Sequence, residues 1–186
     1  MRQEVEKSAM AAQALGTLAA EPEWAKVEAA FQGVAEHIDE SMADARIAEL
    51  LLAPDGVVRA AYPPDGPGVS SIGLDLWDYP ISRDSVRFAH ATRKTVVYGP
   101  YTFLSRGGRT GLIFRYPTWA DEVPPPGMLV DADGRGSWTG VRYWDFEPPA
   151  APGRPRKVFW GICLAVVWWD ILAAELVALL NVDREG

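Results

Sequence analysis

The chain has 186 residues, of which 48% are hydrophobic and 23% are charged, so it can bury the core of one globular domain. Its formal net charge of −7 argues against a nucleic-acid partner, because phosphate binding requires clustered Lys and Arg side chains. A single cysteine excludes an intramolecular disulfide framework. The first residues, MRQEVEKSAM, are charged, lack the apolar region of a signal peptide and are typical of the inside of a helix, which suits a fragment of a longer protein.

Helix-forming residues dominate positions 1–45, where Gly16 and the pair Glu21-Pro22 predict two helices or one broken helix. The second part of this segment carries an apolar stripe at spacings of three and four, namely Trp24, Val27, Phe31, Val34 and Ile38. The stripe requires a partner, either this domain's own sheet or the same helix in a second copy. Our hypothesis is a parallel homodimer in the full-length protein, so that a chain lacking residues 1–20 stays folded but dimerises less.

A first hairpin is predicted next, with strands Ile47–Ala53 and Val57–Tyr62 around the turn Pro54-Asp55-Gly56. PPDGPG at 63–68 is a loop. Residues Ser82–Thr92 then predict a helix, with Ser82 at its N-cap position.

A second hairpin is predicted from Val96–Leu104 and Thr110–Trp119, with Gly107 and Gly108 in its turn. Residues 120–157 are rich in Pro and Gly and show no period, which indicates a long loop or insertion of a kind that is often functional or mobile.

The stretch 158–180, VFWGICLAVVWWDILAAELVALL, could be a membrane span or a buried strand followed by a closing helix, Asp170–Leu180. Its uninterrupted apolar run ends at Trp169, short of the roughly 20 residues that a bilayer demands, and Asp170 and Glu175 interrupt the remainder of the stretch. Alternation favours a strand that is apolar on both faces and therefore lies in the centre of a sheet. One face would carry Val158, Trp160, Ile162, Leu164, Val166 and Trp168, and the other Phe159, Gly161, Cys163, Ala165, Val167 and Trp169.

Small side chains occupy the middle of the second face, so Gly161, Cys163 and Ala165 should lie against a closely packed helix or a pocket floor. Cys163 is then a buried thiol and not a nucleophile. Two hairpins that flank one late central strand make an α+β domain with a five-stranded antiparallel sheet of order 2-1-5-4-3, the arrangement of PAS-like sensor folds.

Six segments, in this order and after a long helix, resemble the CHASE family of extracytoplasmic sensor domains. They are LAPDGVVRAAYP (52–63), IGLDLWDYP (72–80), SRDSVRFAHATRK (82–94), VVYGPYTFL (96–104), GLIFRYPTW (111–119) and FWGICLAVVWWDILAAEL (159–176). The resemblance implies a sensor domain over residues 46–180, preceded by a helical segment (1–45) and followed by a tail (181–186) that leads to a membrane span. It also implies an anchor on each side and a cytoplasmic histidine kinase or diguanylate cyclase as the output. The insertion at 120–157 departs from the family, whose members have a shorter link there, and both anchoring spans are absent from these residues.

Enzymatic chemistry finds little support, and we expect no catalytic residue, no metal site and no cofactor. The two histidines, His37 and His90, have no orienting partner that the sequence reveals. DADG at 131–134 lacks the later ligands of a calcium loop, and a plain acidic turn explains it better. Asp75 and Asp78 are more typical of turns and helix caps than of acid–base catalysis.

A small organic ligand fits the pattern better, since its site needs an apolar lining and a few polar groups. We expect it between the sheet and residues Ile72–Thr92, with the insertion 120–157 as a rim or lid. The candidate ligand-binding residues are Trp77, Arg83, Tyr98, Tyr101, Phe114, Arg115 and Tyr116. Arg83 or Arg115 would pair with a carboxylate on the ligand.

Two other functions stay open at this stage. Eight tryptophans suggest a carbohydrate-binding module, for which Trp119, Trp138 and Trp144 remain available because they lie in or beside the insertion. The third possibility is a dimerisation or interaction module with no small ligand. A thermal-shift panel of organic acids, amino acids, purines and sugars separates the three.

Overall fold

The computed structural model describes residues 2–21, 24–43, 46–103, 107–120, 158–170 and 173. Two helices, α1 (Arg2–Leu15) and α2 (Trp24–Ser41), precede the sheet and are separated by the 3-10 turn η1 (Gly16–Ala20). The prediction of a broken N-terminal helix is thus confirmed.

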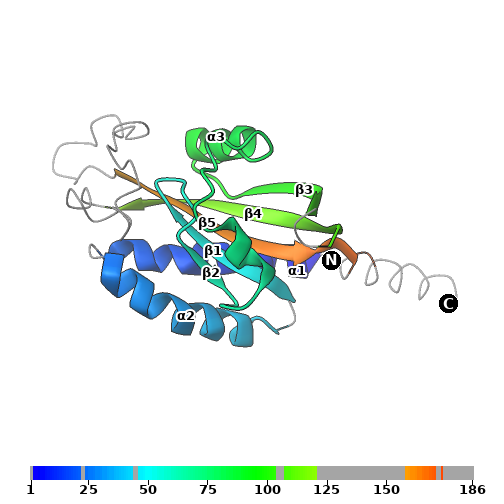
Figure 1. Ribbon diagram of the computed structural model, residues 1–186, viewed down its shortest axis with the longest axis horizontal. Coiled ribbons are helices and arrows are strands. Elements are labelled where there is room, and N and C mark those ends of the chain that lie inside the picture. The colour runs from blue at the N-terminus through cyan, green and yellow to red at the C-terminus, as the bar shows by residue number, and fades with distance from the viewer. Residues whose placement is uncertain are drawn as a thin grey trace, which may run out of the picture.

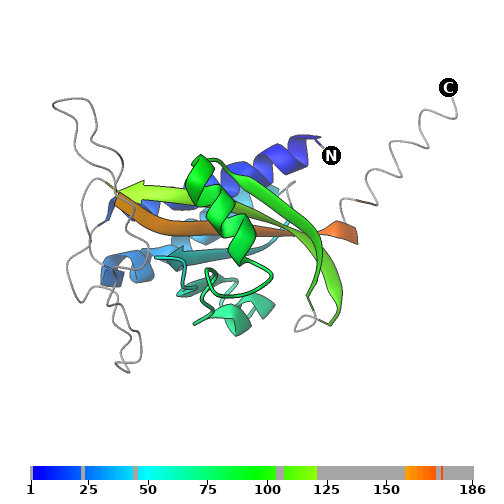
Figure 2. The same cartoon turned by 90° about the horizontal axis from the view of Figure 1, so that it is seen from above.

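The sheet has five antiparallel strands in the spatial order β2-β1-β5-β4-β3, as predicted for a PAS-like α+β fold. The strands are β1 (Ile47–Pro54), β2 (Ala60–Tyr62), β3 (Val96–Phe103), β4 (Arg109–Ala120) and β5 (Val158–Trp168). Helices α1 and α2 cover one face, and α3 (Arg83–Thr92) covers the other together with the 3-10 turn η3 (Pro67–Ser71) (Figure 1). Figure 2 shows α3 crossing the sheet over β4 and β5.

The central strand β5 is buried on both faces, as its sequence predicted. Cys163, Ala165 and Val167 pack in the cluster that contains the α1 and α2 side chains. Ile162, Leu164 and Val166 pack in the cluster on the α3 face. The small side chains of Cys163 and Ala165 share the first cluster with Ala11 and Ala12 of α1, which allows the helix to lie close to the strand.

The predicted faces are wrong at the start of β5. The register between β4 and β5 shifts between Thr118 and Trp119, where Thr118 pairs with Gly161 and Trp119 with Phe159. This irregularity reverses the alternation, so Trp160 belongs with the α1 and α2 side chains and Phe159 belongs to the α3 face. Gly161 lies against the backbone of β1 and does not face a helix.

The second predicted strand begins at Ala60 and not at Val57. The Val58 amide donates to the Leu74 carbonyl at 3.0 Å, the Gly73 amide donates to the Val58 carbonyl at 2.8 Å, and Val57 forms an isolated bridge with Asp75. Because these backbone groups pair with the segment that covers the sheet, they cannot extend the ladder with β1.

The apolar stripe of α2 finds its partner within the same chain. Val27, Phe31 and Ile38 are buried in the cluster that also contains sheet residues such as Leu50 and Phe114, and Trp24 and Val34 pack against its edge. Own-sheet packing therefore explains the stripe, and the homodimer stays a prediction without this surface to motivate it.

Parts of the predicted organisation lie outside the described residues, namely most of the insertion 120–157, most of the closing helix Asp170–Leu180 and the tail 181–186. Within the described part of the chain, no helix combines the length and apolar character that a membrane crossing requires.

Candidate functional site

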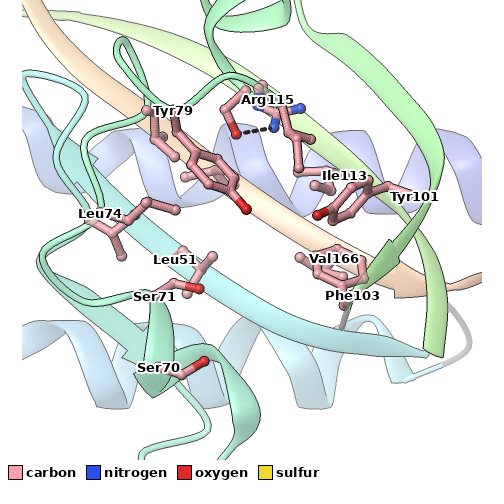
Figure 3. Close-up of a pocket in the computed structure, with 15 residues that line it drawn as sticks. Leu51, Ser70, Ser71, Leu74, Tyr79, Tyr101, Phe103, Ile113, Arg115 and Val166 are labelled. Carbon is pink, nitrogen blue, oxygen red and sulfur yellow. Dashed lines mark hydrogen bonds between the residues drawn. The ribbon is translucent and has the colours of Figure 1, made fainter. Parts of the chain in front are cut away.

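A cavity of about 420 Å³ lies on the α3 face of the sheet, where the covering segment runs from η3 towards α3. Its volume is in the range of small-molecule sites, roughly 300–1,000 Å³. Four strands and the covering segment line it (Figure 3). The lining residues are Leu51, Val58, Ser70, Ser71, Leu74, Leu76, Tyr79, Ile81, Ser82, Tyr101, Phe103, Ile113, Arg115, Leu164 and Val166.

The covering segment is held over the sheet by contacts that its sequence specifies. Asp75 accepts a hydrogen bond from the Trp77 amide at 2.9 Å, the local bond typical of an Asx turn. The indole of Trp77 donates to the carbonyl of Asp55 at 2.8 Å and so fixes the segment to the turn after β1. Leu74, Leu76 and Tyr79 thereby reach the cavity from the side opposite the strands.

Among the described residues that line this cavity, Arg115 is the charged one, and it has no exposed surface. It projects from β4, next to the central strand, and its Nη2 donates to the hydroxyl of Ser82 at 3.1 Å. The centre of the guanidinium lies 5.2 Å from the centroid of the Tyr98 ring. Its Nε and Nη1 are buried and find no hydrogen-bond partner within the described part of the chain.

Burial lowers the pKa of Arg115 to about 10, and the Tyr98 hydroxyl opposes this shift. Arg115 still carries its charge at neutral pH, because a pKa of about 10 lies well above 7. A buried charge with two unpaired donors is costly to the fold, and an anionic partner would offset that cost.

Ser82 occupies the predicted N-cap position of α3, but its hydroxyl makes no capping hydrogen bond. The hydroxyl accepts from Arg115 instead, so it serves the cavity and not the helix end. This contact places the guanidinium at the start of α3, at one end of the cavity (Figure 3).

The other polar side chains among the described lining residues carry hydroxyls. The side chains of Tyr79 and Tyr101 come from opposite sides and direct their hydroxyl oxygens towards the space between them (Figure 3). Ser70 and Ser71 lie at the other end of the cavity from Arg115 (Figure 3). Leu51, Ile113 and Val166 contribute apolar surface from three strands.

Of the seven predicted ligand-binding residues, Tyr101 and Arg115 line the cavity, and Tyr98 contacts the guanidinium of Arg115. Trp77 lies on the same face in an aromatic cluster with His90 and Phe159, at ring-centroid distances of 5.4 and 5.7 Å.

The other three residues lie elsewhere. Phe114 and Tyr116 face α1 and α2, on the opposite side of the sheet from Arg115. Tyr116 borders a separate, more polar hollow of about 370 Å³, beside Gly16 and Thr17 of η1. Arg83 is half exposed, with its Nε 3.6 Å from the carboxylate of the adjacent Asp84.

Several lining residues were not among the predicted ones, above all Tyr79, Ser82 and the two serines of η3. They lie in a segment without sequence periodicity, so only the tertiary contacts of that segment reveal them. Phe103 and Ile113 had a usable signal, since alternation places them on the same strand faces as Tyr101 and Arg115.

The described residues hold no group of three or more His, Cys, Asp or Glu side chains that could bind a metal ion. Cys163 is fully buried, and burial raises the pKa of its thiol to about 12, while the 3.4 Å contact with the Thr118 hydroxyl opposes the shift. Such a thiol is protonated at neutral pH and is a poor nucleophile.

Neither a scan against protein-family models nor a search of curated proteins gives a match. One solved structure, an extracellular ligand binding receptor from Desulfohalobium retbaense DSM5692, is similar with a TM-score of 0.35 and 12% sequence identity. The similarity covers 88% of this chain but only 40% of that chain, so this chain spans less than half the length of the receptor it matches. The CHASE resemblance therefore rests on the six sequence segments.

Proposed function

We propose that this chain is a sensor domain, and not an enzyme, that binds a small carboxylate in the cavity beside Arg115. The observation that carries the proposal is the buried guanidinium, which lines an otherwise largely apolar cavity with two of its three nitrogens unpartnered among the described residues. Arginine pairs with carboxylates through two parallel hydrogen bonds, and in a dry site such bonds are stronger than in water.

The geometry of the guanidinium keeps such a pair possible. Nη2 carries two hydrogens, one on the edge shared with Nη1 and one on the edge shared with Nε. Ser82 accepts one of them. Whichever hydrogen Ser82 takes, one edge with two donors remains for a carboxylate.

As part of this proposal the domain is of the CHASE type, extracytoplasmic and anchored in the membrane by segments outside this sequence. The six segments that resemble the CHASE family and the 2-1-5-4-3 sheet support it. A ligand would be bound between the strands and the segment that enters α3, and its binding would be relayed through the flanking helices to a cytoplasmic kinase or cyclase. Relay requires that the ligand favour one of two arrangements of these helices, because equal affinity for both shifts nothing.

The carbohydrate alternative loses support at Trp119. The His90 ring stacks on Trp119 at a centroid distance of 5.3 Å, and the guanidinium of Arg93 lies 4.4 Å from the centroid of the indole. Two contacts of this kind occupy ring surface that a sugar would need. Trp138 and Trp144 lie outside the described residues.

The test is a thermal-shift panel of small carboxylates, sugars, purines and primary amines, followed by calorimetry on Arg115→Met with Arg83→Met as the matched control. We expect carboxylates to raise the melting temperature. Arg115→Met should weaken their binding about tenfold to a hundredfold, since a charge-assisted hydrogen bond contributes roughly 1.5–3 kcal/mol. Arg83→Met should bind as wild type does, because Arg83 is exposed on α3 and lies outside the cavity lining.

Two results would contradict the proposal. Stabilisation by sugars or purines alone would assign the cavity to another ligand class. Carboxylate binding that survives Arg115→Met in a folded protein would place the site elsewhere.

A further inference from the structure

We infer that the ligand is a monocarboxylate with an uncharged, apolar tail, and not a dicarboxylate or an amino acid. This inference rests on the proposed function and names the class of ligand that the same cavity selects. It depends on the single cationic residue in the described lining, on the absence of acidic residues from that lining, and on the arrangement of its apolar side chains.

Charge sets the first limit. Arg115 is the one cationic residue among the described residues that line the cavity, so a second carboxylate would find only hydroxyl groups and no cation to pair with its charge. No Asp or Glu occurs among those lining residues either, so an ammonium group would also be buried unpaired. Burying an unpaired charge costs more than most single contacts supply, and the cavity should reject both kinds of ligand.

Glu49 is the acidic residue that most needs consideration here. It is fully buried on β1, two residues before Leu51, and lies against η3, where a Cβ atom at Gly68 would be 3.0 Å from its Oε2. Glu49 is not among the residues that line the cavity, whereas Leu51 on the same strand is. The selectivity for an uncharged tail therefore requires that the Glu49 carboxylate stay out of the cavity lining.

Shape sets the second limit. In the view of Figure 3, Arg115 lies at one end of the cavity, and Leu51 and Val166 lie on the other side of the Tyr79 and Tyr101 hydroxyls. A carboxylate at the guanidinium thus directs the rest of the molecule towards aliphatic side chains, among them Ile113 and Leu164. A tail that buries apolar surface there gains affinity in proportion to the area buried, which a short acid such as acetate cannot do.

The experiment uses probes that share six carbons and differ in one group. Hexanoate has one carboxylate and an apolar tail, adipate adds a carboxylate at the far end, norleucine adds an ammonium next to the carboxylate, and hexanamide removes the charge. Acetate keeps the charge without the tail. Binding of each is measured by calorimetry to the full chain, to Arg115→Met and to Val166→Phe, which fills the apolar part.

Hexanoate should bind most tightly. Adipate and norleucine should bind at least about a hundredfold more weakly because each buries an unpaired charge, and hexanamide about tenfold or more weakly. Val166→Phe should weaken hexanoate and leave acetate unchanged, whereas Arg115→Met should weaken both.

The outcomes separate this inference from the function on which it rests. If adipate or norleucine matches or exceeds hexanoate and still depends on Arg115, the monocarboxylate inference is overturned while the carboxylate site stands; preference for norleucine would then point to Glu49. If no carboxylate binds, or if binding ignores Arg115→Met, both fail.

Discussion

At the scale of single residues, Arg115 combines a cost to the fold with a proposed role in ligand binding. Its charge is fully buried, and its Nη2 donates to the Ser82 hydroxyl at 3.1 Å. Replacement of a buried ion by an apolar side chain of similar volume is often neutral or stabilising by about 1–4 kcal/mol. A buried charge of this kind, on the strand next to the central one, fits the proposed binding site, where function and stability compete.

We therefore expect Arg115→Met to unfold in urea at the same or a higher midpoint than wild type, in the absence of ligand. The folded-state pKa of about 10 is below the ordinary 12.5, so the burial penalty is fully present below about pH 10 and is relieved as the pH rises towards 12.5. The stability difference between the two proteins should thus be constant from about pH 6 to 9. A clear loss of stability in Arg115→Met would show instead that the Arg115 side chain stabilises the folded core.

At the scale of elements, the approach of β5 to β1 depends on Gly161. A Cβ atom there would contact the carbonyl oxygen of Ala53 and would lie 2.6 Å from Cα of Pro54. Its φ of +157° is also rare for residues with a side chain. Gly161→Ala should therefore force the strands apart at the end of the β1–β5 ladder, and we expect it to lower the free energy of unfolding by more than about 2 kcal/mol.

Gly33 gives the matched control for this substitution. It lies on α2, where an added Cβ atom would meet nothing within 4 Å. Gly33→Ala should raise stability by roughly 0.5–1 kcal/mol, because alanine favours the helix. Equal effects of the two substitutions in urea unfolding would mean that the strand contact at Gly161 is not limiting.

The order of the strands could be predicted from the sequence, and their local details could not. Two turn-marked hairpins and one strand apolar on both faces leave few arrangements, and the 2-1-5-4-3 sheet is among them. The reversal of faces at Gly161 and the pairing of Val58 with Leu74 depend on contacts between distant segments, which have no local signature. Alternation along β4 already separated Arg115 from Phe114 and Tyr116, so the grouping of all three in one site overlooked the period of the strand.

At the scale of the whole molecule, the N-terminal helix is part of the core and not an appendage. Ala11, Ala12 and Leu15 of α1 have no exposed surface and share one cluster with Cys163 and Ala165 of the central strand. Gly16 continues this packing, since a Cβ atom there would lie 2.9 Å from the ring of Tyr116. These contacts replace the expectation that a chain without residues 1–20 keeps its fold.

We expect deletion of residues 1–20 to abolish cooperative unfolding, as followed by near-ultraviolet circular dichroism in urea. Loss of one large buried side chain costs about 2–5 kcal/mol. Removal of all of α1 uncovers one face of β5, so the summed loss is comparable with the whole free energy of unfolding of a domain, about 5–15 kcal/mol. Leu15→Ala should give a measurable part of this loss in the full chain, whereas Met10→Ala should change little, because Met10 is 54% exposed. A shortened chain with a wild-type midpoint would show that α2 and the sheet form a complete core, and α1 would then be free to serve a second copy.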